Sequence, residues 1–401
     1  RSTPSNSSAA SDVYKRQVQL ELSEKKNLEQ AISKIIKVIK EYNKHRKLFQ
    51  DLFRKVKYQL NPSSFPEAFQ FNTKDTSFIV RVPQSSTTGL KYSGVDGGII
   101  HRSMNFFDVA LIRAVGVLFY HNKDEKPKVK YFPEKNPFPD ILTSVEPLAQ
   151  NEIDYLIALW RIQKEIRCAI DLLENDSPDI LILDGSVLPV IDVKSIQGNE
   201  FLFSQYLRLK ALYRRLYTLS RKKRCLLCGV IKDSRSAILT RKLSLILPHL
   251  SKRPEFKELL NIDYRPIIKQ LRDTDLLFNV LDINERTFES HLSKFNEYEK
   301  DLEDFDIHFF YLKTAEYDTP LRVEFPVLFS DSTNLAQTIS SLICSISTFH
   351  PEYGLPSVII EADARAKIRE DDADILIDEI SSRIGYSSFS LQKRRARNPW
   401  S

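Results

Sequence analysis

The stretch Tyr92-Ser93-Gly94-Val95-Asp96-Gly97-Gly98 decides how the rest of the chain is interpreted. A short apolar strand, expected over residues 90–96, ends in the carboxylate of Asp96, and two glycines follow it. Glycine lets a backbone turn tightly and lets a ligand approach closely. We therefore expect Asp96 to lie beside open space, as a metal-binding carboxylate requires. A plain Asp-Gly-Gly turn is the alternative interpretation.

A second carboxylate, Asp184, occupies a matching position. Residues 180–183 read Ile-Leu-Ile-Leu, which is typical of a buried strand, and Asp184-Gly185-Ser186 follows directly. Carboxylates at strand ends suit ligand binding at the edge of an α/β sheet. The alternative is an aspartate that caps the next turn through its side chain.

A third carboxylate, Glu165, interrupts the apolar face of a helix expected over residues 151–175. That face is formed by Ala158, Ile162, Ala169 and Leu172, at spacings of three and four. The basic residues of the segment are expected to point away from it: Arg161, Lys164 and Arg167. Burying a carboxylate is costly unless a metal or a partner neutralises it. The alternative is a buried ion pair, with Arg113 or Lys232 as the partner.

The donor types predict which metal would bind. Carboxylate oxygens favour Mg²⁺ or Mn²⁺ over zinc, and the seven histidines are scattered singly in the sequence. Two such ions about 4 Å apart can activate water for phosphodiester cleavage. Lys232, at the end of a strand expected over 225–231, would meet a phosphate or orient the nucleophile, or else is a surface lysine. The pair Cys225 and Cys228 in that strand is interpreted as core packing.

Composition sets the class of protein. The 401 residues are 42% hydrophobic and 28% charged, which suits a globular protein with one or two domains. No apolar run is long enough for a membrane helix, no secretory signal is visible, and four cysteines give no disulfide framework. We therefore expect a cytoplasmic protein without a membrane partner. No Walker-type or GxGxxG loop is present, so the chain is not expected to use ATP.

A net charge of +6 permits nucleic-acid binding. The helix expected over residues 200–223 ends in basic residues, and a further arginine follows the next strand. A solvated face is the usual reason for such a run, but it also suits contact with a DNA backbone. The predicted DNA-binding residues are Arg221, Lys222, Lys223 and Arg235.

The chain divides into four predicted segments. Residues 7–17 read SSAASDVYKRQ, like a translated sequencing adapter, so residues 1–17 are expected to be an artefact. Residues 18–87 form an N-terminal segment with an amphipathic helix, which packs on the core or holds a partner or second subunit. The main domain is expected over residues 88–390, and residues 391–401 are a basic tail.

Strands and helices alternate along the main domain, which predicts an α/β fold with a mixed central sheet flanked by helices. Residues 121–145 are expected to be a charged, proline-rich excursion, and residues 236–300 mainly helical. Further strands are expected over 78–82, 108–120, 308–313 and 321–325, and helices over 333–349 and 357–384.

Five stretches together resemble the NurA family of nucleases. They are SGVDGG over 93–98, RIQKE over 161–165, LILDGS over 181–186, GVIKDSRS over 229–236 and PLRVEFP over 320–326. The similarity spans residues 88–380. It implies an RNase H-like core, a homodimer, Mn²⁺-dependent cleavage of DNA and a partnership with the hexameric HerA ATPase. The implied function is single-strand endonuclease and 5'–3' exonuclease activity during double-strand-break processing, with Mg²⁺ as an alternative ion.

The sequence departs from the family pattern near its end. Leu355 stands where the family usually has a tyrosine, and Asp363 where it usually has a histidine. Asp363 would serve as a fourth metal ligand. The change also leaves open a catalytically degenerate subunit that binds DNA and the HerA ATPase without cleaving. A third reading is an RNA-directed nuclease with the same acidic cluster.

Overall fold

The computed structural model describes most of the chain from residue 77 onwards, and a short N-terminal helical part. The described residues are 29–30, 32–41, 43, 75, 77–105, 107–122, 126–250, 254–257, 265–292, 305–329, 334–347 and 350–385. The expected artefact over 1–17 and the basic tail lie outside these ranges. So does most of the N-terminal segment, of which residues 32–41 are helical, as expected.

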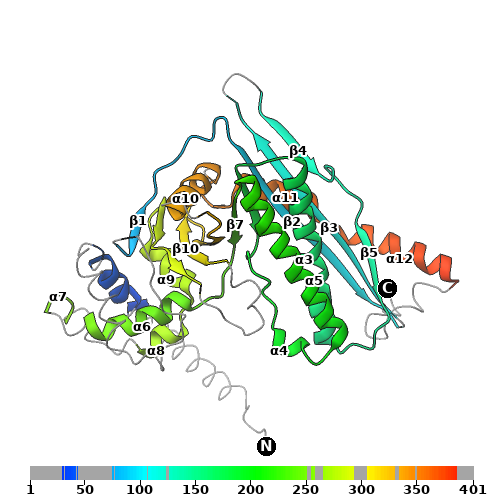
Figure 1. Cartoon of the computed structure of the whole chain (residues 1–401). Helices are drawn as coiled ribbons and strands as arrows, with labels where there is room; N and C mark the ends of the chain where they lie inside the picture. The colour runs from blue at the N-terminus through cyan, green and yellow to red at the C-terminus, as the bar shows by residue number, and fades with distance from the viewer. Residues whose placement is uncertain are drawn as a thin grey trace, which may run out of the picture.

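A mixed eleven-stranded sheet runs through the molecule (Figure 1). At its centre, β2 (Lys91–Ser103) pairs antiparallel with β3 (Asp108–Tyr120) and parallel with β6 (Ile180–Asp184). Strand β7 (Leu226–Ile231) lies parallel to β6 on its far side. This confirms the predicted α/β class with a mixed sheet.

The sheet continues on both sides of this centre. Beyond β7, antiparallel pairing adds β11 (Leu321–Pro326), β10 (Ile307–Lys313), β8 (Glu285–Thr287) and β1 (Ile79–Arg81), and β9 (Ser290–His291) also pairs with β10. Beyond β2, strand β3 carries β4 (Lys128–Phe132) and β5 (Asp140–Ser144).

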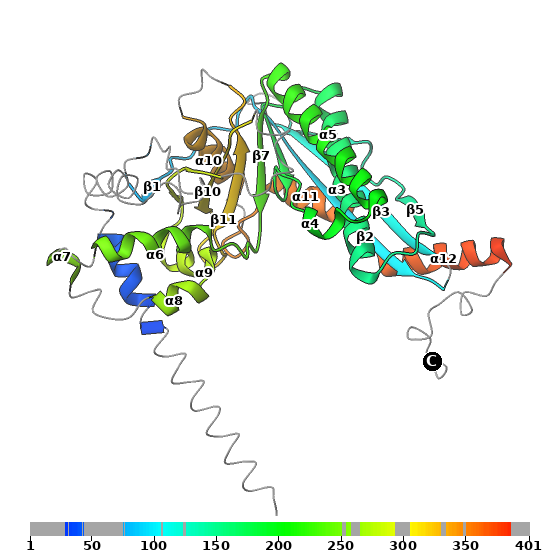
Figure 2. The same cartoon turned by 60° about the horizontal axis from the view of Figure 1, so that its bottom comes forward.

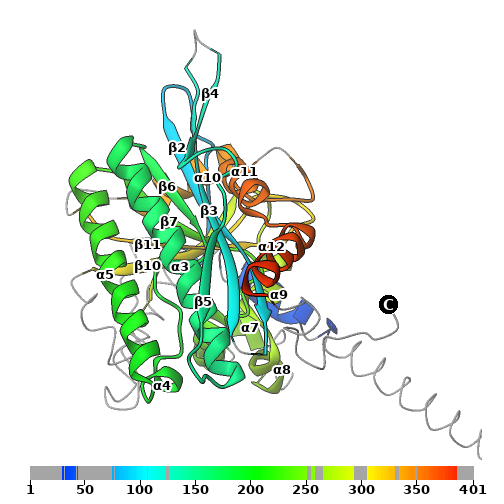
Figure 3. The ribbon, with the colours of Figure 1, turned by 90° about the vertical axis from the view of Figure 1, so that its right-hand side faces the viewer.

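Helices cover both faces of the central strands. On one face lie α3 (Gln150–Asn175) and α5 (Glu200–Lys223), and on the other α11 (Ser357–Ala366) and α12 (Glu370–Ile384), with α10 (Leu335–Ile346) beside them (Figure 3). The alternation of β6 explains this arrangement. Leu181 and Leu183 belong to the core under α3 and α5, whereas Ile180 and Ile182 belong to the core under α10 and α11.

The remaining helices lie beside β10 and β11. They are α6 (Ile238–Leu250), α7 (Pro254–Lys257), α8 (Arg265–Gln270) and α9 (Asp273–Val280), and a short α4 (Val193–Ile196) precedes α5. No helix of the described residues is long and apolar enough to cross a membrane.

Three expectations about turns and strands were wrong in whole or in part. The glycines after Asp96 make no turn, because β2 continues through them to Ser103. The excursion over 121–145 contains β4 and β5, whose exposed, charged faces hide the strand pattern that edge strands show weakly. The described residues of the segment 236–300 are mainly helical up to α9, but they then form β8 and β9.

The helix expected over 357–384 is in fact two helices, because α11 ends at Ala366. Arg113 of β3 lies at that end, where its Nη1 donates to the carbonyls of Arg365 and Lys367 at 3.4 and 3.3 Å. A cation that bonds the last carbonyls stabilises a helix terminus. Arg113 is therefore used for this capping and not for an ion pair with Glu165.

Candidate metal centre and nucleic-acid groove

Three carboxylates meet near the middle of the sheet. One oxygen each from Asp96, Asp184 and Asp363 lies within 4.8 Å of the others. The parallel register explains the first two, because Val95 pairs with Leu183 and the next residue on each strand is an aspartate. Helix α11 packs across β2 and β3 and supplies Asp363. We call these three residues the carboxylate cluster.

Glu165 approaches Asp96 from the opposite face of the sheet. Val358 and Ala366 of α11 lie against Gly94 and Gly98, so the alternate residue Asp96 also faces α11. At Gly97 the strand faces α3, and an added Cβ would lie 2.4 Å from Glu165 Oε1. The glycines therefore let one helix approach β2 from each side.

The expected neutralising partner of Glu165 was wrong. Arg161, one turn earlier on α3, places Nη1 3.6 Å from Glu165 Oε1. Neither Arg113 nor Lys232 pairs with it in the described structure. Oε1 is buried and has no hydrogen-bond partner among the described residues. A buried carboxylate oxygen left in this state is costly, which marks it as a position for a further ligand.

Burial and mutual repulsion shift the acids strongly. Burial, followed by the charges of Asp184 and Glu165, raises the pKa of Asp96 to about 8. Burial raises the pKa of Glu165 to about 7, although Arg161 opposes the shift. Acids held this close bind a proton or a cation at neutral pH, because desolvated like charges repel.

Lys232 supplies a positive charge at the rim of the carboxylate cluster. Its Nζ lies 2.9 Å from Asp184 Oδ2 and 3.9 Å from Asp363 Oδ1. Burial lowers the pKa of Lys232, but the hydrogen bond and charge of Asp184 outweigh burial and raise it overall. The side chain is 39% exposed, so a charged ammonium here can also reach a bound phosphate.

The residues present fit a hard divalent cation. All the donors are carboxylate oxygens, and Glu165 offers a buried oxygen without a hydrogen-bond partner among the described residues. Oxygen donors of this kind suit Mg²⁺ and Mn²⁺. Asp363, with a side chain 53% exposed, leaves the centre open to solvent on one side.

A groove of about 900 Å³ lies on the α3 side of the sheet and reaches two of the four acids. Figure 2 shows the elements that line it, α3 and α6, on opposite sides of β7. Glu165 and Asp184 belong to its wall. Its lining also includes four arginines: Arg161, Arg235, Arg241 and Arg322. The same lining holds five acids, Glu165, Asp184, Asp192, Asp233 and Glu324, and Arg161 and Arg322 pair with two of them.

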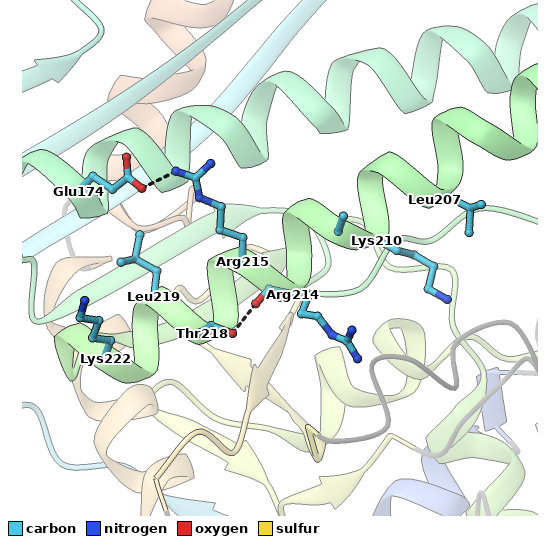
Figure 4. A pocket seen from close by; sticks show the side chains of 9 residues that line it. Glu174, Leu207, Lys210, Arg214, Arg215, Thr218, Leu219 and Lys222 are labelled. Atoms are coloured by element: carbon cyan, nitrogen blue, oxygen red, sulfur yellow. Dashed lines mark hydrogen bonds and ion pairs between the residues drawn. The ribbon is translucent and has the colours of Figure 1, made fainter.

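The structure separates the predicted DNA-binding residues. Arg235 lines the groove. The end of α5, with Arg221, Lys222 and Lys223, lies near the start of β7, whereas Lys232 follows the other end of that strand. Lys222 lines a different pocket of about 510 Å³ along α5. Figure 4 shows that pocket, with Arg215 paired to Glu174.

Several groove and rim residues were not predicted as site residues. Arg322 and Glu324 of β11 form an ion pair, and Ser186 donates to Glu324, which is 1% exposed. Tyr353 lies close enough to Lys232 and Asp363 for their charges to act on its hydroxyl. The signal for Glu324 was its place in the PLRVEFP stretch, and Tyr353 stands two residues before Leu355.

In the strand order β4–β3–β2–β6–β7, strands β4, β3 and β2 pair antiparallel and strands β2, β6 and β7 pair parallel, with carboxylates at the centre. This defines an RNase H-like fold. A NurA domain profile matches residues 90–368. The chain therefore belongs to the NurA family, as its sequence predicts.

Several solved structures resemble this chain, and one of them, with a TM-score of 0.50, supports the fold. The NurA nuclease from Sulfolobus solfataricus is 16% identical, with a TM-score of 0.50, over 92% of this chain and 97% of that one. A NurA structure bound to dAMP and manganese is 12% identical, with a TM-score of 0.40, over 92% and 98%. Endonuclease V from Bacillus subtilis is 11% identical, with a TM-score of 0.30, over 76% and 88%. No curated protein matches the chain.

Proposed function

We propose that this protein is a metal-dependent DNA nuclease that processes double-strand-break ends in the cytoplasm. The observation that carries the proposal is the meeting of Asp96, Asp184 and Asp363, one oxygen of each lying within 4.8 Å of the others. The proposed activity is that of a single-strand endonuclease and 5'–3' exonuclease. The proposed partners are a second copy of the chain and a HerA-like hexameric ATPase. These finer points rest on family membership.

In this proposal, Asp96, Asp184 and Asp363 hold the metal, with Glu165 as a further ligand. Bound Mn²⁺, or Mg²⁺, would supply an activated water and charge stabilisation for phosphodiester hydrolysis. Lys232 keeps its ammonium beside the cluster and contacts the phosphate that is cut. The groove arginines orient the DNA strand by its phosphates, which carries no base specificity.

The decisive test is cleavage of end-labelled single- and double-stranded DNA with Mn²⁺, Mg²⁺ or EDTA. We expect Asp96→Asn to lower the rate by more than about 100-fold, because even outer-shell partners of a metal contribute that much. Asp378→Asn is the matched control, since Asp378 is an exposed acid of α12. An Asp96→Asn protein that is folded and cleaves at the normal rate would refute the assignment. RNA and hybrid substrates test the RNA-directed reading.

The non-catalytic alternative is tested separately by calorimetry. The place of Asp363 within the cluster supports metal binding despite the missing histidine. We expect Mn²⁺ to bind the wild-type chain and not Asp184→Ala. Absence of Mn²⁺ binding and of cleavage, with a HerA partner present, would favour the degenerate subunit.

The path of the DNA can be tested with two basic residues. Arg235→Ala should weaken single-stranded DNA binding and reduce the salt slope by about 0.7, the value for one lost phosphate contact. Lys223→Ala is the comparison, because Lys223 lies at the far end of β7 and donates to Ser177 at 3.3 Å. Equal losses in the two variants would mean that DNA also follows the end of α5.

A further inference from the structure

Strands β9 and β10 pair with each other and, together with the residue before each strand, carry the motifs Glu-x-His and Asp-x-His. They are Glu289-Ser290-His291 and Asp306-Ile307-His308, and His308 pairs directly with His291. Residues two apart on a strand point to the same face, and directly paired residues share a face. All four polar side chains therefore converge, although the sequence showed only single histidines.

The contacts in this histidine–carboxylate cluster are specific. Both imidazoles turn Nε2 toward one carboxylate, that of Asp306, with His308 Nε2 3.1 Å from Oδ2. The other nitrogen of His308, Nδ1, bonds to Glu289. Among the described residues, the ion pairs of Glu289 and Asp306 are made with these imidazoles alone.

We infer that His291, His308 and Asp306 form a second metal site, which binds a zinc-class ion. One ligand atom from each lies within 4.8 Å of the others. An ion with bonds of about 2.0 Å holds tetrahedral ligands about 3.3 Å apart, so a small rotation of Asp306 completes the set. Imidazole nitrogens prefer zinc and its transition-metal neighbours, whereas the carboxylate cluster prefers Mg²⁺ or Mn²⁺.

Glu289 has the position of an outer partner for this ion. A proton on His308 Nδ1 donates to Glu289, and Nε2, which bonds to Asp306, would release its proton and offer its lone pair when the ion binds. This is the carboxylate–histidine–metal arrangement that fixes the tautomer of a ligating histidine. Asp306 has a side chain 52% exposed, so the ion has a route from solvent and room for a water as fourth ligand.

This site is distinct from the carboxylate cluster. His308 pairs with Phe325 of β11, whereas Arg322 of β11 pairs with Ile231, the residue before Lys232. Strands β11 and β7 also separate β10 from β6. The ion would join β9 to β10 across the segment between them, which is a structural role independent of the proposed nuclease activity.

The test is zinc binding by the full chain after its metals are removed. The background variant is Asp96→Asn with Asp184→Asn, which disables the carboxylate cluster. Calorimetry at mildly alkaline pH should then show one equivalent of Zn²⁺ bound, and Co²⁺ should give a visible absorption band. Adding His291→Ala should remove that equivalent and the gain in Tm caused by zinc.

Two further variants make the result decisive. Asp306→Asn changes a half-exposed side chain, so loss of zinc there does not reflect failure to fold. His101→Ala is the matched control, because His101 pairs with one carboxylate, Asp108, at 3.0 Å. The inference would be overturned if the chain bound no zinc, or if zinc binding were unchanged in both His291→Ala and Asp306→Asn. The cluster would then be a network of ion pairs between imidazoles and carboxylates.

Discussion

The carboxylate cluster and the histidine–carboxylate cluster both hold acidic side chains close together, but different cationic side chains lie beside those acids. In the first, Asp96 and Asp184 stand side by side with Lys232 as their cation. In the second, two imidazoles take the place of the lysine: His308 lies between Asp306 and Glu289, and His291 pairs with Asp306. Lysine can be displaced by a metal and then meet a phosphate, whereas imidazole itself ligates. The comparison shows that the type of cation beside an acid indicates what the site can bind.

The largest expected effect that separates the clusters comes from Gly97→Ala. The new Cβ would meet Glu165 Oε1 at 2.4 Å, so Glu165 must move away from Asp96. We expect activity to fall by about 100-fold, as for a lost metal partner, and stability by about 1–3 kcal/mol from overpacking. Urea unfolding and cleavage assays measure both.

Gly198→Ala is the control for that variant, because nothing lies within 4 Å of its Cβ position. Zinc binding by the histidine–carboxylate cluster should be unchanged in both proteins. Full activity in Gly97→Ala would show that Glu165 takes no part in the reaction.

Lys232→Met should have a smaller effect, about 10-fold on the cleavage rate, since one general contact is lost and the ligands remain. Without the ammonium 2.9 Å from Asp184, repulsion among the acids grows, and metal should bind more tightly. Cleavage rate and Mn²⁺ affinity are measured together. A fall in both would indicate that Lys232 supports the structure of the cluster.

The smallest effects are two pH dependences of stability in the metal-free chain. Burial raises the pKa of Asp96 from 3.8 to about 8, so the folded state binds the extra proton and loses stability as pH rises across that window. Burial opposes protonation of His308, but Asp306 and Glu289 raise its pKa from 6.5 to about 9. The stability that this proton contributes to the folded state is therefore lost as the pH rises between those two values.

Thermal unfolding from pH 4 to 9 separates the two windows. Asp96→Asn should flatten the lower part of the curve and His308→Gln the upper part, each by a few degrees. Identical curves for wild type and both variants would contradict these shifted pKa values.

Local patterns predicted the centre of the fold well. The run before Asp184 and the apolar face around Glu165 were read correctly as a buried strand and a buried helix face. The position of Asp184 next to Asp96 follows from parallel pairing of β2 and β6, and Glu165 is placed by packing of α3 against Gly97. Cys225 and Cys228 are core residues, as expected.

The predictions that were wrong concern features that depend on contacts between residues far apart in the sequence. The first strand was expected to end at Asp96, because the sequence does not show that α3 fills the space beside Gly97. The break after Ala366 depends on Arg113, far back in the chain. The histidine–carboxylate cluster was missed because β9 and β10 are separated in sequence and only their pairing brings the histidines together.

The capping of α11 by Arg113 has a consequence for synthesis of the chain. Helix α11 carries Asp363 and packs on β2 and β3, which leave the ribosome long before it. Domains in which distant segments must meet complete their contacts late. The carboxylate cluster is therefore complete only when almost the whole domain has emerged. A growing chain that folds from its N-terminus would lack Asp363, one of the three proposed metal ligands in the carboxylate cluster, until α11 has emerged.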